Sequence, residues 1–190
     1  MTPFLNRHLV SVWNPAYATD AMDAHVEVLL RRAAQCRDGE LAEDDVYVWW
    51  GRARSPRRED ALPHLDKVVD LDHQTRDGRP LHLYLTDYRS LYVADVGEVT
   101  LEDVREVEGE LDAMPAYYRE LAFDCFFRVW DIRRLVADDT REVIASLRQL
   151  RNLNYHGNPV SLYGGIVDLP LIVEREVEVD CFSDRAALTE

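Results

Sequence analysis

The sequence predicts an α+β protein with a curved, mainly antiparallel sheet or small mixed barrel and about three flanking helices. Three observations predict this class: strand-like runs outnumber helical patterns, the helical patterns are scattered among them, and neither a repeat nor a regular strand–helix alternation is present. No linker divides the chain, so residues 1–182 are expected to form one domain. The polar residues 183–190 are expected to be a tail or the start of a linker.

The first elements are a strand and a helix. Residues 8–13, HLVSVW, read as a strand that Asn14 and Pro15 end. Asp20 then occupies an N-cap position before a helix that Asp38 and Gly39 end. Its apolar residues share one helical face: Met22, Val26, Leu29, Leu30 and Ala33.

The next strand carries two adjacent tryptophans. It covers residues 46–53 within VYVWWGRARSPRR. Because successive side chains of a strand point to opposite faces, Trp49 and Trp50 cannot enter the same core. One of them is expected on the core side, and the other is expected under a helix, at an interface or in a pocket.

The middle of the chain predicts a loop, a hairpin and a helix. Residues 56–80 are polar and include Pro63, Gly78 and Pro80, which favours loop with a short strand near Val68 and Val69. Two apolar runs, residues 81–85 and 91–96, flank TDYRS and predict a hairpin. Thr100 is expected to cap a second, peripheral helix through residues 101–111.

The last elements are a strong strand, a helix and further strands. Residues 123–130 are strand-like, and Asp139 with Glu142 forms a helix start. The helix is expected to run from Asp139 to about residue 153, with its core face formed by Val143, Ile144, Leu147 and Leu150. HGNP ends it, and VSLYGG and LPLIVEREVEVDCF supply the last strands.

Composition and charge limit the function classes. The chain has 190 residues and a formal net charge of −14, with Lys67 as its one lysine. Such an acidic chain is not a general DNA binder, because nonspecific affinity depends on neutralising many phosphates, although one basic patch can still act locally. No apolar run approaches the length of a membrane span, and the N-terminal residues lack a signal-peptide layout. A cytoplasmic location without membrane contact is therefore expected.

Motifs for catalysis, cofactors and metals are not found in the sequence. No GxSxG, P-loop, GxGxxG or HExxH motif is present. Three histidines with nearby aspartates, His64, His73 and His82, form none of the compact metal motifs and are expected in a solvated loop. Cys125 and Cys181 lie in apolar runs and are expected to be core residues. The sequence thus favours a protein that is not an enzyme and has neither cofactor nor metal.

Three stretches are candidates for binding. In the first, accessible tryptophan faces at Trp49 or Trp50 would stack on a base, and the adjacent arginines would hold phosphates; these are Arg52, Arg54, Arg57 and Arg58. The alternative is that a helix covers the second tryptophan and the arginines solvate a loop.

The other two stretches lie at strand ends. In SVWNPAY, Asn14 follows Trp13 and offers a donor and an acceptor for reading the edge of a base or amide. In TDYRSLY, Asp87 and Tyr88 combine charge and a ring in a loop between two strands. The alternatives are an Asx-type turn after the first strand and a polar hairpin loop with an Asp87–Arg89 pair.

The layout resembles the PUA-like superfamily, in particular its EVE-type branch, which is related to the YTH and ASCH domains. The resemblance rests on LVSVWNPAY, the helix after it and the strand VYVWWGRARS, and it spans about residues 8–173. It implies a small mixed barrel whose aromatic pocket receives a modified or flipped base. Position by position, it points to Trp13 and Asn14 at the end of the first strand and to Trp49 or Trp50 in the tryptophan strand. Two departures are long helices and an acidic overall charge.

The leading hypothesis is a non-enzymatic module that binds DNA or RNA. A pocket of Trp13, Trp49 and Tyr88 would hold a base that is possibly modified, Asn14 and Asp87 would read polar edges, and the arginines would contact phosphates. Stacking contributes about 1–3 kcal/mol per base, so such a module would bind weakly without a further domain or protein partner. The alternatives are a protein–protein adaptor with an acidic surface and a tryptophan anchor, a nucleotide sensor using the same pocket, and a hydrolase built on His64, His73 and His82.

Overall fold

All strands of the described residues belong to a single sheet. The structure is a computed structural model, and it describes residues 5–13, 20–54, 62, 64–161 and 170–182. Its sheet has eight strands: β1 (Arg7–Val12), β2 (Val48–Ala53), β3 (His82–Thr86), β4 (Leu91–Thr100), β5 (Phe123–Val136), β6 (Leu150–Asn152), β7 (Asn158–Pro159) and β8 (Leu171–Arg175). Four α-helices accompany them: α1 (Ala21–Arg37), α2 (Leu65–Val69), α3 (Asp72–Arg76) and α4 (Thr140–Leu147).

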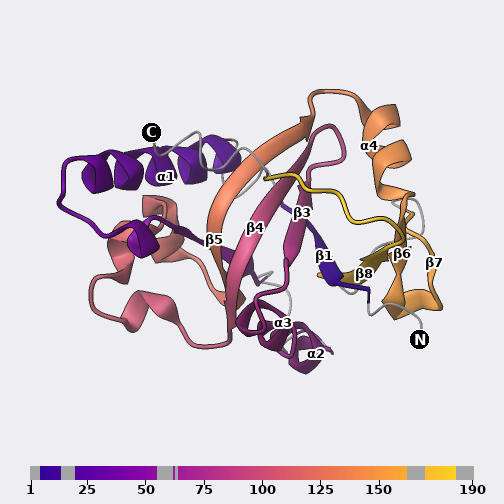
Figure 1. The fold of residues 1–190 in the computed structure, drawn as a ribbon, viewed down its shortest axis with the longest axis horizontal. Helices are drawn as coiled ribbons and strands as arrows, with labels where there is room; N and C mark the ends of the chain where they lie inside the picture. Colours follow the sequence, from indigo (N-terminus) through magenta and orange to yellow (C-terminus); the bar gives the residue numbers. More distant parts are fainter. Residues whose placement is uncertain (1–4, 14–19, 55–61, 63, 162–169, 183–190) are drawn as a thin grey trace.

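The strand order brings the two ends of the chain together in the sheet. The order is β2-β5-β4-β3-β1-β8-β6-β7, so the first strand lies between β3 and the last strand. The pair β1–β3 is parallel, and the other pairs are antiparallel. The sheet is strongly twisted and is not closed, because β2 and β7 form its two edges (Figure 1). The predicted α+β class and mainly antiparallel sheet are confirmed.

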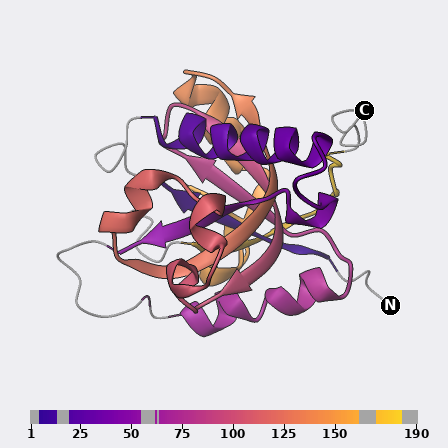
Figure 2. The same cartoon turned by 90° about the vertical axis from the view of Figure 1, so that its left-hand side faces the viewer.

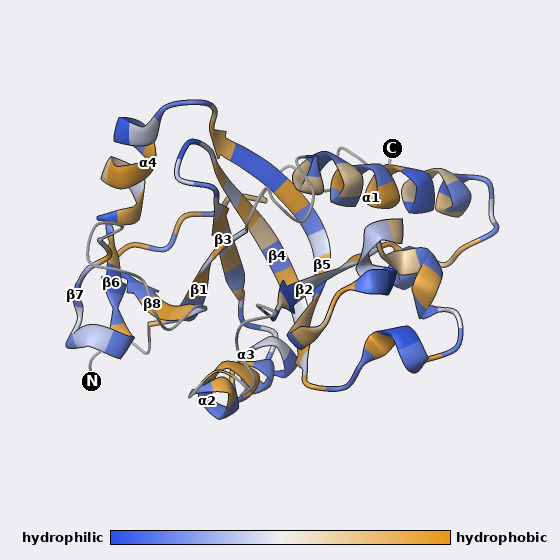
Figure 3. Cartoon of the chain, turned by 180° about the vertical axis from the view of Figure 1, so that it is seen from behind, coloured by the Kyte–Doolittle hydropathy of each residue, from blue (hydrophilic) through white to orange (hydrophobic). Residues whose placement is uncertain are grey.

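Strand alternation divides the sheet into two apolar faces. On the first face, Leu9, Leu83 and Leu85 pack with residues of α1 and the α2 region, among them Met22 and Val68. In Figures 1 and 2, α1 and the α2–α3 pair lie at opposite ends of the sheet. Figure 3 shows both hydrophobic and hydrophilic bands along β5.

The second face is formed by the strand residues that alternate with those of the first face. Val10 and Tyr84 lie opposite each other in the β1–β3 register and pack with Val143 and Leu147 of α4. The half-buried Cys181 and Phe182 pack against the same cluster. Residues 176–182, which we call the outer segment, follow β8 and run back across this face, where Figure 1 shows them in yellow.

Helix α1 is fixed to β2 through a buried histidine. His25 is fully buried, and its Nδ1 lies 2.6 Å from the carbonyl oxygen of Ala21 while its Nε2 lies 2.8 Å from the hydroxyl of Tyr118. Burial lowers the pKa of His25 to about 4, so the ring is neutral near pH 7. A neutral ring satisfies both contacts when Nδ1–H donates to Ala21 and Nε2 accepts from Tyr118. The Tyr118 oxygen in turn accepts a hydrogen bond from the backbone N–H of Gly51 at 2.9 Å.

Some predicted elements differ from the observed ones. The helix expected after Thr100 is absent: β4 extends to Thr100, and 3-10 turns follow, η2 (Val104–Glu106), η3 (Glu110–Ala113) and η4 (Ala116–Glu120). The loop with a strand near Val68 instead contains α2 and α3. Helix α4 ends at Leu147, and Leu150 belongs to β6. The cap prediction for Asp139 is confirmed, since its carboxylate accepts from the N–H groups of Arg141 and Glu142, whereas the side chain of Asp20 makes no cap hydrogen bond.

The absence of the helix expected after Thr100 has a physical reason. Gly109 adopts a left-handed conformation (φ 86°), which interrupts any continuous helix between Thr100 and Pro115. Met114 and Ala113 are buried against Trp49, so tertiary packing rather than helical periodicity determines this segment.

Among the described residues, no helix has both the length and the apolar character needed to span a bilayer.

Candidate functional site

Both tryptophans of VYVWWGRARSPRR are buried. Trp49 is 3% exposed and Trp50 is 5% exposed. They point to opposite faces, as predicted, because Trp50 packs on His25 in the core of the first face and Trp49 packs with Tyr118 and Met114 under the 3-10 turns. The indole N–H of Trp49 donates to Glu110 at 2.6 Å. The second tryptophan is therefore covered, by 3-10 turns rather than by an α-helix.

The predicted phosphate contacts are divided between described and undescribed residues. Arg54 forms an ion pair with Asp124 at 2.9 Å, and Arg52 donates to the carbonyl oxygen of Ala53. Arg57 and Arg58 lie outside the described residues. Arg54 is thus held against the body of the protein by a carboxylate that a phosphate would have to displace.

The predicted strand-end residues meet at one end of β1 and β3. The backbone N–H of Trp13 donates to the carbonyl oxygen of Thr86, and the Trp13 ring packs edge-on against Tyr92. Asp87 accepts from the N–H groups of Arg89 and Ser90, which forms a turn. The guanidinium of Arg89 pairs with Asp138 rather than with Asp87.

These residues do not form one pocket with the tryptophan strand. Tyr88 is 42% exposed and has a left-handed backbone conformation (φ 73°). Trp13 and Tyr88 lie near β1 and β3, whereas Trp49 lies on β2, which β4 and β5 separate from β3. Asn14 lies outside the described residues.

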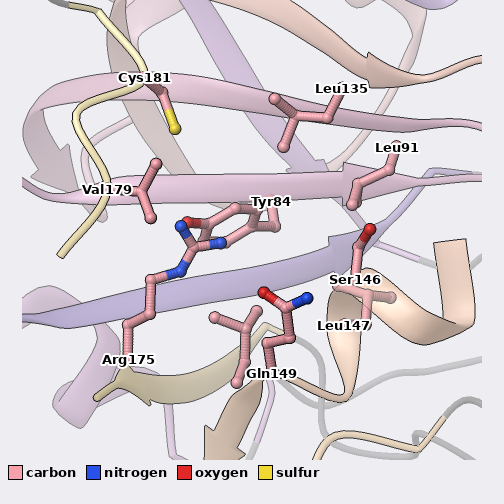
Figure 4. Close-up of a pocket in the computed structure, with 10 residues that line it drawn as sticks. Tyr84, Leu91, Leu135, Ser146, Leu147, Gln149, Arg175, Val179 and Cys181 are labelled. Carbon is pink, nitrogen blue, oxygen red and sulfur yellow. The ribbon is translucent and has the colours of Figure 1, made fainter. Parts of the chain in front are cut away.

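A cavity of about 220 Å³ opens on the second face of the sheet. Its lining comes from four strands, from the end of α4, from the start of β6 and from the outer segment: Tyr84, Leu91, Leu135, Ser146, Leu147, Gln149, Leu150, Arg175, Val179 and Cys181. Figure 4 shows the guanidinium of Arg175 beside the hydroxyl of Tyr84, with the Gln149 amide nearby and aliphatic side chains around them. We call this cavity the Tyr84–Arg175 pocket.

Local strand geometry explains why a cation lies in this pocket. Alternation along β8 puts Arg175 on the same face as Leu171 and Val173, which belong to the apolar cluster of the second face. Alternation along β3 puts Tyr84 on the same face as His82. The guanidinium carbon of Arg175 lies 5.2 Å from the centre of the Tyr84 ring, which is a cation–π contact.

One buried polar atom on each of Tyr84 and Arg175, the hydroxyl and Nε, has no hydrogen-bond partner. Tyr84 is 1% exposed, yet its hydroxyl is unpaired, and the buried Nε of Arg175 is unpaired as well. Among the described residues, Arg175 forms no ion pair with a carboxylate. An unpaired buried donor lowers the stability of the folded state by about 1–3 kcal/mol. Two such donors at one cavity would be explained by a ligand that accepts their hydrogen bonds.

Tyr84, Cys181 and the two histidines near Tyr84 are neutral near pH 7. Burial raises the pKa of Tyr84 far above its ordinary value, so Tyr84 is a neutral O–H donor. Burial also raises the pKa of the Cys181 thiol, which is the opposite of what activates a nucleophile. His8 and His82 stack with ring centres 4.8 Å apart, and burial lowers the pKa of each to about 4.

The predicted histidine group is dispersed. His64 contacts the carbonyl oxygen of Pro170, His82 stacks on His8, and His73 is exposed on α3. In the part of the chain that the structure describes, no three metal-ligating side chains come together. Cys125 is fully buried, as expected of a core residue.

Sequence reasoning missed Tyr84, Gln149 and Arg175. A signal existed for two of them: in LHLYL and LPLIVER, alternation puts the tyrosine and the arginine on strand faces that also carry apolar residues. Gln149 follows α4 in an irregular connection and carries no such signal. Comparison of the chain with protein-family models gives no match, and comparison with the curated proteins gives none either.

Proposed function

We propose that this protein is a non-enzymatic binding module that holds one base-sized group, from a nucleic acid or a free nucleotide, in the Tyr84–Arg175 pocket. The observation that carries the proposal is the pair of buried, unpaired polar atoms, Tyr84 Oη and Arg175 Nε, at the same cavity. This proposal keeps the predicted function but moves its site away from Trp49 and Trp50, whose rings are covered.

The chemistry of the lining suits a planar polar group. Aliphatic side chains of Leu91, Leu147 and Val179 offer surfaces for the faces of a ring. The Gln149 amide offers a donor and an acceptor, which is the equipment that the sequence analysis sought in Asn14. Arg175 and Tyr84 both donate, so the complementary group on the ligand is an acceptor.

The PUA-like fold belongs to the same proposal. Its support is the layout: a strand that leads to Trp13, then α1, then the tryptophan-bearing β2, and a mixed sheet in which β1 and β3 are parallel. Within the described residues the sheet is open, whereas the resemblance implies a small barrel. In this proposal the described sheet corresponds to an opened form of that barrel.

The test is a binding screen read at the pocket itself. Free nucleosides, nucleotides and short single-stranded oligonucleotides, with and without modified bases, would be titrated into ¹⁵N-labelled protein while the Nε–H signals of the arginines are followed. We expect at least one compound to shift the Arg175 signal in a saturable way and to lose affinity in Tyr84→Phe. If no compound changes the Arg175 Nε–H signal, even at the highest concentration of the titration, the proposal is refuted.

A matched control exists in Tyr47→Phe. Tyr47 is also buried, but its hydroxyl donates to Glu110 in the cluster under the 3-10 turns. Removing that hydroxyl should lower stability without changing ligand affinity. An equal loss of affinity in both variants would indicate a general structural effect rather than a role of Tyr84 in binding.

A further inference from the structure

The charge of the Tyr84–Arg175 pocket determines more about the ligand than its size does. Arg175 supplies a guanidinium whose Nε is buried, and no carboxylate among the described residues pairs with it. A neutral carbonyl group would accept the hydrogen bonds but would bring no negative charge into direct contact with this guanidinium. An oxyanion would do both, because two oxygens of a carboxylate or a phosphate can accept the paired N–H groups of an arginine fork.

Tyr84 strengthens the same preference. Its hydroxyl is unpaired and 1% exposed, and the Arg175 guanidinium lies 5.2 Å from its ring centre. O–H and N–H donors that converge on one oxyanion give short, charge-assisted hydrogen bonds. The remaining lining is mainly aliphatic and suits a compact body attached to that oxyanion.

The outer wall of the pocket has the opposite charge. Val179 and Cys181 of the outer segment line the pocket, and the acidic residues Glu176, Glu178 and Asp180 alternate with apolar residues along the same segment. Glu176 and Glu178 have side-chain exposures of 70% and 40%. A nucleic-acid strand that entered here would bring its neighbouring phosphates against these carboxylates, which is repulsive.

We propose that the physiological ligand is a free small molecule with one terminal oxyanion, a carboxylate or a monophosphate, on a compact body, and that Arg175 and Tyr84 bind this oxyanion. This inference rests on the proposed function, because it uses the same pocket. It differs from a strand-reading module, in which internal phosphodiesters flank the bound base.

The test compares probes that differ in one group. A nucleoside, its 5′-monophosphate, benzoate and a single-stranded oligonucleotide with hydroxyl ends would be titrated by calorimetry at constant ionic strength. The monophosphate and benzoate arms distinguish the two sources of the oxyanion. We expect at least one of these two to bind roughly 10-fold or more tightly than the nucleoside, in keeping with the strength of charge-assisted hydrogen bonds, and the oligonucleotide to bind most weakly.

The variants assign the effect to the pocket. Arg175→Gln should weaken oxyanion binding by roughly 10- to 100-fold. Arg175→Lys keeps the charge but loses Nε, so its affinity should lie between those of the unchanged protein and Arg175→Gln. Arg151→Gln is the matched control, because Arg151 lies in the neighbouring strand β6, does not line the pocket and pairs with exposed Glu176. Its affinity should stay within about 2-fold of that of the unchanged protein.

The outcomes separate this inference from the proposed function. If the nucleoside or the oligonucleotide binds as tightly as the monophosphate and benzoate, and still depends on Tyr84, then the ligand class is wrong and the binding module stands. If every probe, including the oligonucleotide, leaves the Arg175 Nε–H signal unchanged, then both are wrong. Thermal unfolding of each variant would show whether a lost affinity reflects a lost fold.

Discussion

At the scale of the residue, two buried tyrosine hydroxyls should respond in opposite ways to removal. The Tyr84 hydroxyl is unpaired, whereas the Tyr118 hydroxyl contacts His25 Nε2 and the N–H of Gly51. Tyr84→Phe should therefore leave the free energy of unfolding unchanged or raise it by about 1 kcal/mol, while Tyr118→Phe should lower it by about 1–3 kcal/mol. Denaturant unfolding of both variants, without ligand, measures the difference. Equal destabilisation would mean that Tyr84 has a partner after all.

A second residue-scale prediction concerns a glycine below a tryptophan. A Cβ atom at Gly97 would lie far inside van der Waals contact with Nε1 of Trp130. Gly97→Ala should therefore lower the free energy of unfolding by about 1–3 kcal/mol, the usual range for overpacking. Combining it with Trp130→Ala, which removes the ring, should recover part of the loss in a double-mutant cycle. Additive losses would contradict the steric explanation.

At the scale of the element, three buried histidines join separate parts of the fold. His8 and His82 stack between β1 and β3, and His25 links α1 to Tyr118. Burial lowers the pKa of each to about 4 from an ordinary value of 6.5. The unfolded chain therefore binds these protons first as the pH falls, and the folded state loses stability between about pH 6.5 and pH 4, on the order of 3 kcal/mol for each imidazole.

This loss approaches the whole stability of a typical domain, so we expect acid unfolding before all three rings are protonated. Side-chain NMR signals of the histidines, followed from pH 8 downward, would show three rings that stay neutral below pH 6. Stability measured over the same range should be flat above about pH 7 and should fall below about pH 6.5. His73→Gln, at an exposed position of α3, serves as the control and should leave the pH profile unchanged. Ordinary titration of His8 or His82 near pH 6.5 would show that the pair is not buried in solution.

At the scale of the whole molecule, β1 connects two groups of strands. It pairs with β3 on one side and with β8 on the other, so all contact between β2–β5 and β6–β8 within the sheet passes through it. Leu9 of β1 is fully buried in the core. Leu9→Ala should lower the free energy of unfolding by about 2–5 kcal/mol, and far-UV circular dichroism and tryptophan fluorescence should report one shared transition. Two separate transitions would show that the two strand groups unfold independently.

Sequence patterns predicted correctly those elements in which the local preference of the residues agrees with their packing in the fold. Trp49 and Trp50 face opposite sides as alternation requires, and Asp139 caps α4 as its position predicts. The segment after Thr100 was mispredicted because its apolar residues pack as 3-10 turns on Trp49, which is a tertiary effect. Likewise, the short helices α2 and α3 form in a polar stretch where Val68 is nonetheless fully buried.

The candidate site was less predictable than the fold. Aromatic residues beside arginines suggested a binding surface at Trp49. In the structure Trp49 is buried and donates a hydrogen bond to Glu110, and Arg54 forms an ion pair with Asp124. Tyr84 and Arg175 are 91 residues apart by their sequence numbers and meet only because β1 lies between β3 and β8. Single-sequence patterns carry no information on such pairings, because alternation gives the face of a residue and not its neighbours in other strands.

The position of β1 also has a consequence for synthesis on the ribosome. Its partner on one side, β8, is the last described strand to leave the exit tunnel, although β1 itself is among the first segments to emerge. A nascent chain can pair β1 with β3 early but must leave the other edge of β1 open until translation reaches Arg175. Since Arg175 also lines the pocket, a chain that terminates before β8 would lack this part of the pocket wall together with the second partner of β1.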